Sequence, residues 1–171
     1  MFITNNKIAA FSILELLVAM SIASILMGTA MIGLQDITLS LNKSDAKAQV
    51  RNHLRLAQVQ SVNEGGRGVL LLAADGLSYS FGYDYITDGY DTTAPVSYDA
   101  SALQWTKNLP NLIKISLSKE VIFDSKGRVI DSFGAITDVD VRFYEQSSGS
   151  DVLYENACLS SVGVMTFGAT C

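Results

Sequence analysis

The chain has 171 residues, of which 49% are hydrophobic and 17% are charged, and its formal net charge is -5. This length accommodates one modest domain together with an anchor, and it excludes two full-sized domains. The acidic balance argues against a nucleic-acid partner, because a negatively charged surface repels the phosphate backbone. The densest basic cluster consists of Arg51, His53 and Arg55, which we interpret as a solvated helix face.

The most informative segment is a long apolar run near the N-terminus. Residues 11–35 read FSILELLVAMSIASILMGTAMIGLQ, and the section from Leu16 to Leu34 contains no charged residue. A helix rises about 1.5 Å per residue, so roughly 20 residues cross the hydrocarbon core of a bilayer. We therefore predict a transmembrane helix over residues 11–35, preceded by a short leader of residues 1–10.

Three simpler interpretations of this run compete with a specialised anchor. It could be a cleaved secretory signal, with the small residues Gly28-Thr29-Ala30 at the cleavage site. It could also be a plain signal anchor or a buried core helix. The weakly basic leader and the carboxylate inside the run argue against a cleaved signal, and the length of the run argues against a core helix.

Glu15 is the anomaly within the run, because it is the one charge between Phe11 and Gln35. A charged side chain at the centre of a bilayer costs about 2.5–3.5 kcal/mol on insertion scales, and such a residue is normally kept for a partner. The position of Glu15 at the start of the run fits a partner charge that another chain supplies.

The stretch AFSILELLVAM, residues 10–20, resembles the class III signal of type IV prepilins and type II secretion pseudopilins. The resemblance implies that a prepilin peptidase cuts between Ala10 and Phe11 and that Phe11 is then N-methylated. Glu15 would become the fifth residue of the mature chain and pair with the ammonium group of a neighbouring subunit in low-dielectric surroundings. The family usually has Gly before the cut, so Ala10 is a departure that leaves the rate of cleavage open.

The helix is predicted to continue beyond the membrane, from about Phe11 to Asn63. Its second part, residues 36–64, is expected to be amphipathic and to pack on a sheet, and Gly65-Gly66 is a stop signal. Apolar or small residues recur there at helical spacing: Leu34, Ile37 and Leu41, then Val50, Leu54, Ala57 and Ser61.

Residues 65–171 are predicted to form a β-rich head, which makes the fold class α+β: a long N-terminal helix on an antiparallel sheet. Residues 86–109 are interpreted as a long surface loop that contacts other subunits or cargo. A calcium site at Asp84, Asp88 and Asp91 is a weaker alternative for this region. The expected strands are 69–72, 78–85, 113–117, 121–123, 128–130, 139–144 and 164–167.

Cys158 and Cys171 both lie near the C-terminus. Two thiols in a protein exported across a membrane favour a disulfide, which would tie down the last strand. Many pilins likewise have a disulfide near the C-terminus.

The stretch VIFDSKGRV, residues 121–129, is similar to a pattern in the GspH/FimT-like minor pseudopilins and minor pilins, as is RLAQVQSV, residues 55–62, with its following glycine turn. This resemblance implies a non-enzymatic filament subunit for type II protein secretion or type IV pilus biogenesis. It would be anchored in the bacterial inner membrane with its head in the periplasm, or sit at a filament tip. The implied partners are other pilin or pseudopilin subunits, the prepilin peptidase and the inner-membrane assembly platform. No cofactor and no metal are expected.

Two alternatives stay open. A DNA-binding minor pilin for natural transformation is disfavoured because residues 159–171 contain no Lys or Arg. A membrane-tethered enzyme is disfavoured because the chain shows no Ser/His/Asp set, metal cluster or phosphate-binding glycine loop. The sequence leaves open which of the two machines the subunit would serve, and whether it is a minor or a major subunit.

Overall fold

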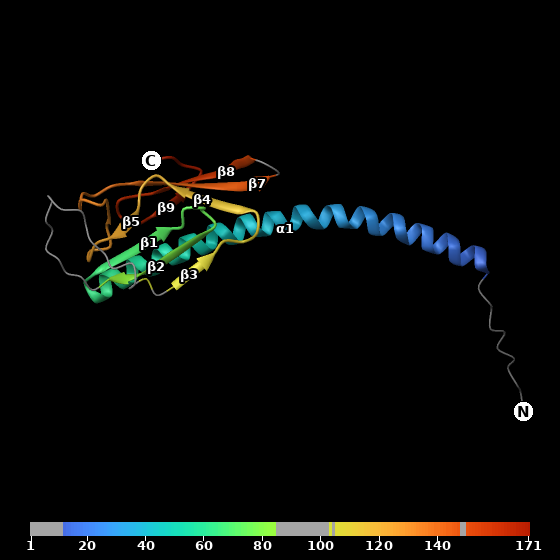
Figure 1. Ribbon diagram of the computed structural model, residues 1–171, viewed down its shortest axis with the longest axis horizontal. Coiled ribbons are helices and arrows are strands. Elements are labelled where there is room, and N and C mark those ends of the chain that lie inside the picture. Colours follow the sequence, from blue (N-terminus) through green and yellow to red (C-terminus); the bar gives the residue numbers. More distant parts are fainter. Residues whose placement is uncertain (1–11, 85–102, 104, 148–149) are drawn as a thin grey trace, which may run out of the picture. The chain divides into compact units, whose positions relative to one another are not determined.

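The computed structural model describes residues 12–84, 103, 105–147 and 150–171. These residues form one helix, α1 (Ile13–Glu64), and nine strands (Figure 1). The chain divides into two compact units, Met1–Ser40 and Leu41–Cys171, and α1 contributes to both. The helix predicted from about residue 11 to residue 63 is therefore present, and it begins and ends within two residues of the expected bounds.

The nine strands form two antiparallel sheets where one had been expected. The first sheet has the order β3-β2-β1-β5-β6, and the second has the order β4-β7-β8-β9. The first contains β1 (Arg67–Leu72), β2 (Ser78–Asp84), β3 (Trp105–Asn108), β5 (Val121–Phe123) and β6 (Val129–Ile130). The second contains β4 (Ile113–Leu117), β7 (Val139–Ser147), β8 (Ser150–Leu159) and β9 (Met165–Phe167).

One face of the second part of α1 is buried in the head. The buried side chains of α1 are three or four residues apart, which places them on one face of the helix. The buried positions are Ala46, Val50, Leu54, Ala57 and Ser61. They are mostly small, so a strand can approach closely: a Cβ on Gly68 of β1 would collide with the Ala57 carbonyl. Val50, Leu54, Ala57 and Ser61 confirm the predicted amphipathic face.

Two strands depart from the sequence-based expectation. β3 lies inside residues 86–109, which had been assigned to a loop, and β8 had not been predicted. All four residues of β3 are exposed, so no alternation of buried and exposed side chains marks it. In β8 a register irregularity opposite Phe143 and Tyr144 interrupts the alternation of period two. Residues 86–102 and 104 of the loop, with Asp88 and Asp91, lie outside the described residues.

A single side chain of α1 connects both sheets. The Gln58 Nε2 group donates to the carbonyl oxygen of Gly127 at 2.7 Å and to that of Val162 at 2.9 Å. Gly127 lies between β5 and β6, and Val162 lies between β8 and β9. Gly163 has a φ of +80°, and a Cβ there would collide with the Gln58 amide. Both turns therefore close around one carboxamide.

Replacing Gln58 with Leu keeps the side-chain volume but removes both hydrogen bonds. We expect the free energy of unfolding to fall by about 2 kcal/mol, because each net hydrogen bond contributes roughly 1 kcal/mol. Urea denaturation of the detergent-solubilised chain measures this loss. Asn52→Leu, at an exposed position of the same helix, is the matched control and should stay within about 0.5 kcal/mol of the parent. An unchanged Gln58→Leu protein would contradict the bridging role.

Candidate functional site

The start of α1 is capped by its own sequence. The backbone N–H of Leu14 donates to the Ser12 hydroxyl at 3.3 Å, and the N–H of Leu16 donates to the Ser12 carbonyl at 3.1 Å. Ser12 followed by Glu15 three residues later is the pattern of a capping box. Glu15 thus lies in the first turn, where the helix dipole favours a negative charge. This cap was not predicted, although the S-x-x-E pattern of Ser12 and Glu15 is present in the sequence.

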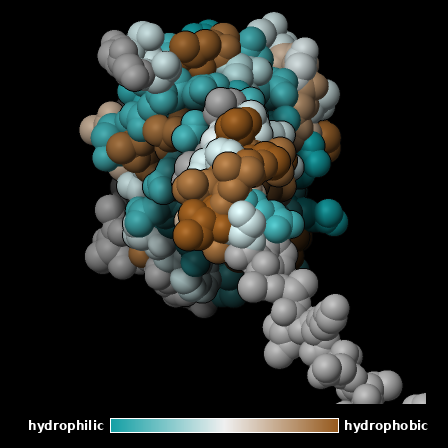
Figure 2. Space-filling view, turned by 90° about the vertical axis from the view of Figure 1, so that its right-hand side faces the viewer, coloured by the Kyte–Doolittle hydropathy of each residue, from teal (hydrophilic) through white to brown (hydrophobic). Residues whose placement is uncertain are grey.

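The first part of α1 exposes large hydrophobic side chains in all directions. Ile13, Leu17, Met20, Ile25 and Leu26 are each more than half exposed, and Figure 2 shows this surface in brown. α1 is a candidate membrane span by its length and composition. Exposure of so much apolar surface in water would be costly, so this part of the helix requires an apolar environment.

The hydroxyl groups in this part of the helix are satisfied within the helix itself. Ser21 donates to the carbonyl of Val18 at 2.8 Å, and Ser24 donates to that of Met20 at 2.8 Å. Thr29 and Thr38 donate to carbonyls three and four residues earlier, at 3.0 and 2.8 Å. In hydrocarbon no water is present to bind these groups, so such internal bonds lower the cost of insertion.

Ala10 and Phe11, the residues of the expected cleavage site, lie outside the described residues. The cut, the methylation and the pairing of Glu15 with a neighbouring ammonium group therefore stay predictions. Glu15 itself lies on an exposed turn of α1, where a second chain could reach it.

The predicted basic cluster is divided between the two sheets. The Arg51 guanidinium lies 4.5 Å from the centre of the Phe167 ring of the second sheet. The His53 ring stacks on Phe81 of the first sheet, with centroids 4.4 Å apart. Arg55 is exposed. The interpretation of all three as a solvated face is thus wrong for His53, which packs against the sheet and is only partly exposed.

His53 also forms a short hydrogen bond with Tyr79, whose hydroxyl lies 2.6 Å from Nδ1. Burial lowers the pKa of His53 below its ordinary value of 6.5, and the positive charge of Lys107 lowers the pKa further. Burial also raises the pKa of Tyr79, with a smaller contribution from Asp45. The lowered pKa of His53 and the raised pKa of Tyr79 both fit a neutral imidazole whose Nδ1 accepts a hydrogen bond from the Tyr79 hydroxyl.

Because the pKa of His53 is lowered by folding, the unfolded chain binds this proton more readily than the folded protein. The stability from this group is complete above pH 6.5 and is lost as the pH falls below that value and through the folded-state pKa. We expect His53→Gln, which still offers Tyr79 an acceptor but does not titrate, to show a smaller drop in Tm between about pH 7.5 and about pH 5. Thermal unfolding of both proteins in detergent measures the difference. Equal drops in the two proteins would contradict this role for His53.

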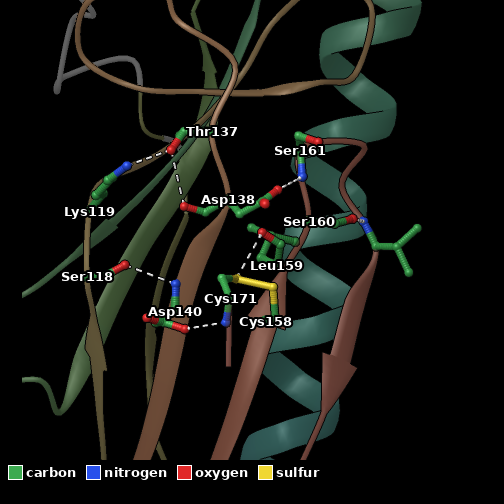
Figure 3. The surroundings of a disulfide bond; sticks show 11 residues. Ser118, Lys119, Thr137, Asp138, Asp140, Cys158, Leu159, Ser160, Ser161 and Cys171 are labelled. Atoms are coloured by element: carbon green, nitrogen blue, oxygen red, sulfur yellow. Dashed lines mark hydrogen bonds between the residues drawn. A yellow bond between two sulfur atoms is a disulfide. The ribbon is translucent and has the colours of Figure 1, made fainter. Parts of the chain in front are cut away.

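The C-terminus is held to the second sheet by a disulfide and a hydrogen bond (Figure 3). Cys158 in β8 is joined to Cys171, with Cα atoms 5.1 Å apart. The backbone N–H of Cys171 donates to the Asp140 carboxylate at 2.8 Å, while the N–H of Asp140 donates to the Ser118 hydroxyl at 2.9 Å. The predicted disulfide therefore ties the last residue to β8, and the two hydrogen bonds link it to β7 and to Ser118, which directly follows the edge strand β4.

Loss of this disulfide should destabilise the head without unfolding the first part of α1. A loop of 13 residues is worth about 3 kcal/mol in the chain-entropy account of disulfides. We expect the double variant Cys158→Ser and Cys171→Ser to lose between about 2 and 3 kcal/mol of unfolding free energy. The parent treated with a reductant should show the same loss in denaturant titrations. A reductant effect that persists in the double variant would show that the bond is not its cause.

The described residues offer no group of three or more His, Cys, Asp or Glu side chains placed to hold a metal ion. Asp84 lies buried at the end of β2. The other two carboxylates of the calcium alternative fall outside the described segments, so that alternative stays a hypothesis.

Comparisons with known proteins bear on both ends of the molecule. Residues 5–31 match the prokaryotic N-terminal methylation motif. The fold is similar to that of the type IV minor pilin FimU of Pseudomonas aeruginosa, with a TM-score of 0.52 and 11% identity over 74% of this chain and 87% of that chain. It is also similar to the minor pseudopilin EpsH of the type II secretion system of Vibrio cholerae, with a TM-score of 0.50 and 10% identity over 74% of this chain and 95% of that chain. No curated protein matches the chain in sequence.

Proposed function

We propose that this chain is a member of the type IV pilin-like superfamily and, within it, a minor, non-enzymatic filament subunit that assembles from the inner membrane. The methylation motif over residues 5–31 and the fold similar to that of FimU support this proposal. The observation that carries the proposal is Glu15, a carboxylate in the first turn of α1, directly before the uncharged apolar run from Leu16 to Leu34. In a filament this negative charge would be paired, because a neighbouring subunit would supply a positively charged N-terminal ammonium group.

The assembly step follows from the chemistry of the N-terminus. Cleavage between Ala10 and Phe11 by the prepilin peptidase would release an ammonium group at Phe11, which N-methylation leaves positively charged. Glu15 of the adjacent subunit would pair with this ammonium in surroundings of low dielectric constant, where the attraction is strong. Breaking such a buried pair is costly, so the pair would register one subunit against the next.

Location follows from the same arrangement. The apolar part of α1 would hold the chain in the inner membrane, with the head in the periplasm. The disulfide between Cys158 and Cys171 supports an oxidising compartment for the head. FimU is a type IV minor pilin and EpsH belongs to a type II secretion system. We therefore propose the class that both share, with other subunits and the inner-membrane assembly platform as partners.

Glu15→Gln tests the assembly role, because it removes the charge and keeps the shape. We expect the variant to stay in the membrane fraction but to enter crosslinked filament complexes at least about tenfold less well, since losing one member of a buried ion pair costs about 3–5 kcal/mol. Asp36→Asn is the matched control, as Asp36 is the next acidic residue along α1. Normal incorporation of Glu15→Gln would contradict the proposal.

Mass spectrometry of the purified parent protein accompanies this experiment. The expected mature chain begins at N-methylated Phe11 and retains Glu15. An intact Met1 start, or a cut after Ala30 that removes Glu15, would leave no basis for the pairing.

A further inference from the structure

One end of the second sheet lies beside the residues where α1 enters the head. The Lys43 ammonium binds the Glu145 carboxylate at 2.7 Å, and the Asn42 side chain donates to the carbonyl of Asn111 at 3.3 Å. Strand register places Glu145 opposite Ile113 on one side and opposite Val152 on the other. The turn before β4 and the start of β8 therefore share this end with the first head residues of α1 (Figure 1).

This end exposes four large apolar side chains, which we call the head base. Their exposed fractions are 64% for Leu41, 53% for Leu112, 50% for Val152 and 45% for Leu153. Val152 and Leu153 are successive residues of β8 and face opposite sides of the sheet, so the head base is the tip of the sheet and not one flat patch. Exposed apolar side chains gathered at one end of a domain favour contact with another apolar phase or partner.

The charges around the head base cancel. Lys43 pairs with Glu145 at 2.7 Å, and Lys114 pairs with Asp151 at 2.7 Å. The side-chain contribution of these two pairs is neutral, so attraction to a strongly charged partner is not what this end offers. The available interaction is burial of apolar surface.

Leu112 adds a second, independent observation. Its φ is 67°, the one positive value among the described residues other than glycine. Asn or Gly adopts this left-handed conformation at lower cost than Leu. The turn holds Leu112 there, since its carbonyl accepts from the Gln146 N–H at 2.8 Å and the N–H of Ile113 donates to Pro110 at 3.1 Å. A strained position that presents an exposed Leu favours a role for that side chain outside the head.

We propose that the head base rests in the interfacial layer of a phospholipid bilayer. This rests on the proposed function, in which α1 crosses the membrane. Leu41 follows Asp36 by five helical residues, a rise of about 8 Å. The headgroup layer on each side of the hydrocarbon core is roughly 5–8 Å thick. The exposed Leu34 and Ile37 lead along α1 to Leu41 at helical spacing. By this spacing along the chain, Leu41, the first residue of the head base, lies within reach of the lipid surface.

The test uses the full chain in nanodiscs of phosphatidylcholine. A single thiol is introduced at Val152→Cys or Leu112→Cys and labelled with an environment-sensitive fluorophore. The two native cysteines are joined in a disulfide, so the added thiol is the reactive one. The matched control is Val162→Cys, which is 62% exposed and follows the opposite end of β8. Lipids with a spin label near the headgroup serve as quenchers.

We expect labels at positions 152 and 112 to be quenched at least about threefold more strongly than the label at 162, because short-range quenching requires contact with lipid. Addition of phosphatidylglycerol should leave the ratio unchanged, since the head base carries paired charges. Leu112→Asn fits the left-handed conformation, so it should keep the Tm of the parent. It should nevertheless reduce quenching of the label at 152.

Three results would overturn the proposal. Equal quenching at 152 and 162 would place the head base away from lipid. Protection of the label at 152 that rises with the protein-to-lipid ratio, without quenching, would identify a second subunit as the occupant. A chain that does not co-elute with the nanodisc would refute the membrane anchor and hence the proposed function, whereas the first two results leave the anchor intact.

Discussion

The head depends on one carboxamide that serves two sheets. The Nε2 group of Gln58 has two N–H donors and gives one each to carbonyls in turns of the first and the second sheet. The two sheets are separate hydrogen-bonded ladders. They are joined directly by backbone bonds such as Val129 N–H to the Ser161 carbonyl at 2.8 Å and Ile115 N–H to the Gly76 carbonyl at 2.9 Å, and α1 adds the Gln58 bridge. The first of these turns is stiffened by the buried Asp124, which accepts from two backbone N–H groups and pairs with Arg128. Because the turn at Gly127 is rigid and bonded to α1, the first sheet is held on the same helix as the second, and both contribute to one core.

The regular parts of the fold followed from local sequence patterns. The helix was predictable because a continuous apolar run passes into a repeat of three and four residues with no proline between. The strands 113–117 and 121–123 were predicted with their observed bounds, since turn residues flank each of them. β3 carries the sequence WTKN with every side chain exposed, and only pairing with β2 makes it a strand. Such pairing is tertiary information that no local pattern contains.

The site residues were predictable where a residue type was unusual for its sequence surroundings. They were not predictable where contacts between distant segments determine the environment. Glu15 stood out because a charge interrupted an apolar run. The cap at Ser12 was not predicted, because Glu15 belongs both to the S-x-x-E capping pattern and to the processing motif. His53 looked solvated because its neighbours in sequence are charged, whereas its ring stacks on a strand distant in sequence. In Leu-Pro-Asn-Leu, Asn111 is the residue expected to adopt positive φ, yet Leu112 adopts it.

The inward-bonded hydroxyls in the apolar part of α1 have a consequence for the proposed assembly. Four hydroxyl groups each donate a hydrogen bond to a backbone carbonyl of α1 itself: those of Ser21, Ser24, Thr29 and Thr38. A neighbouring helix can therefore make van der Waals contacts along this length, but these four groups offer it no hydrogen-bond donor. In the proposed filament, hydrogen-bonded register between neighbouring helices would therefore depend on the pairing of Glu15 with the Phe11 ammonium and not on these four hydroxyls. The contact that fixes the register between subunits would then lie at one end of each subunit. The rest of the apolar helix would contribute packing without such a directional contact.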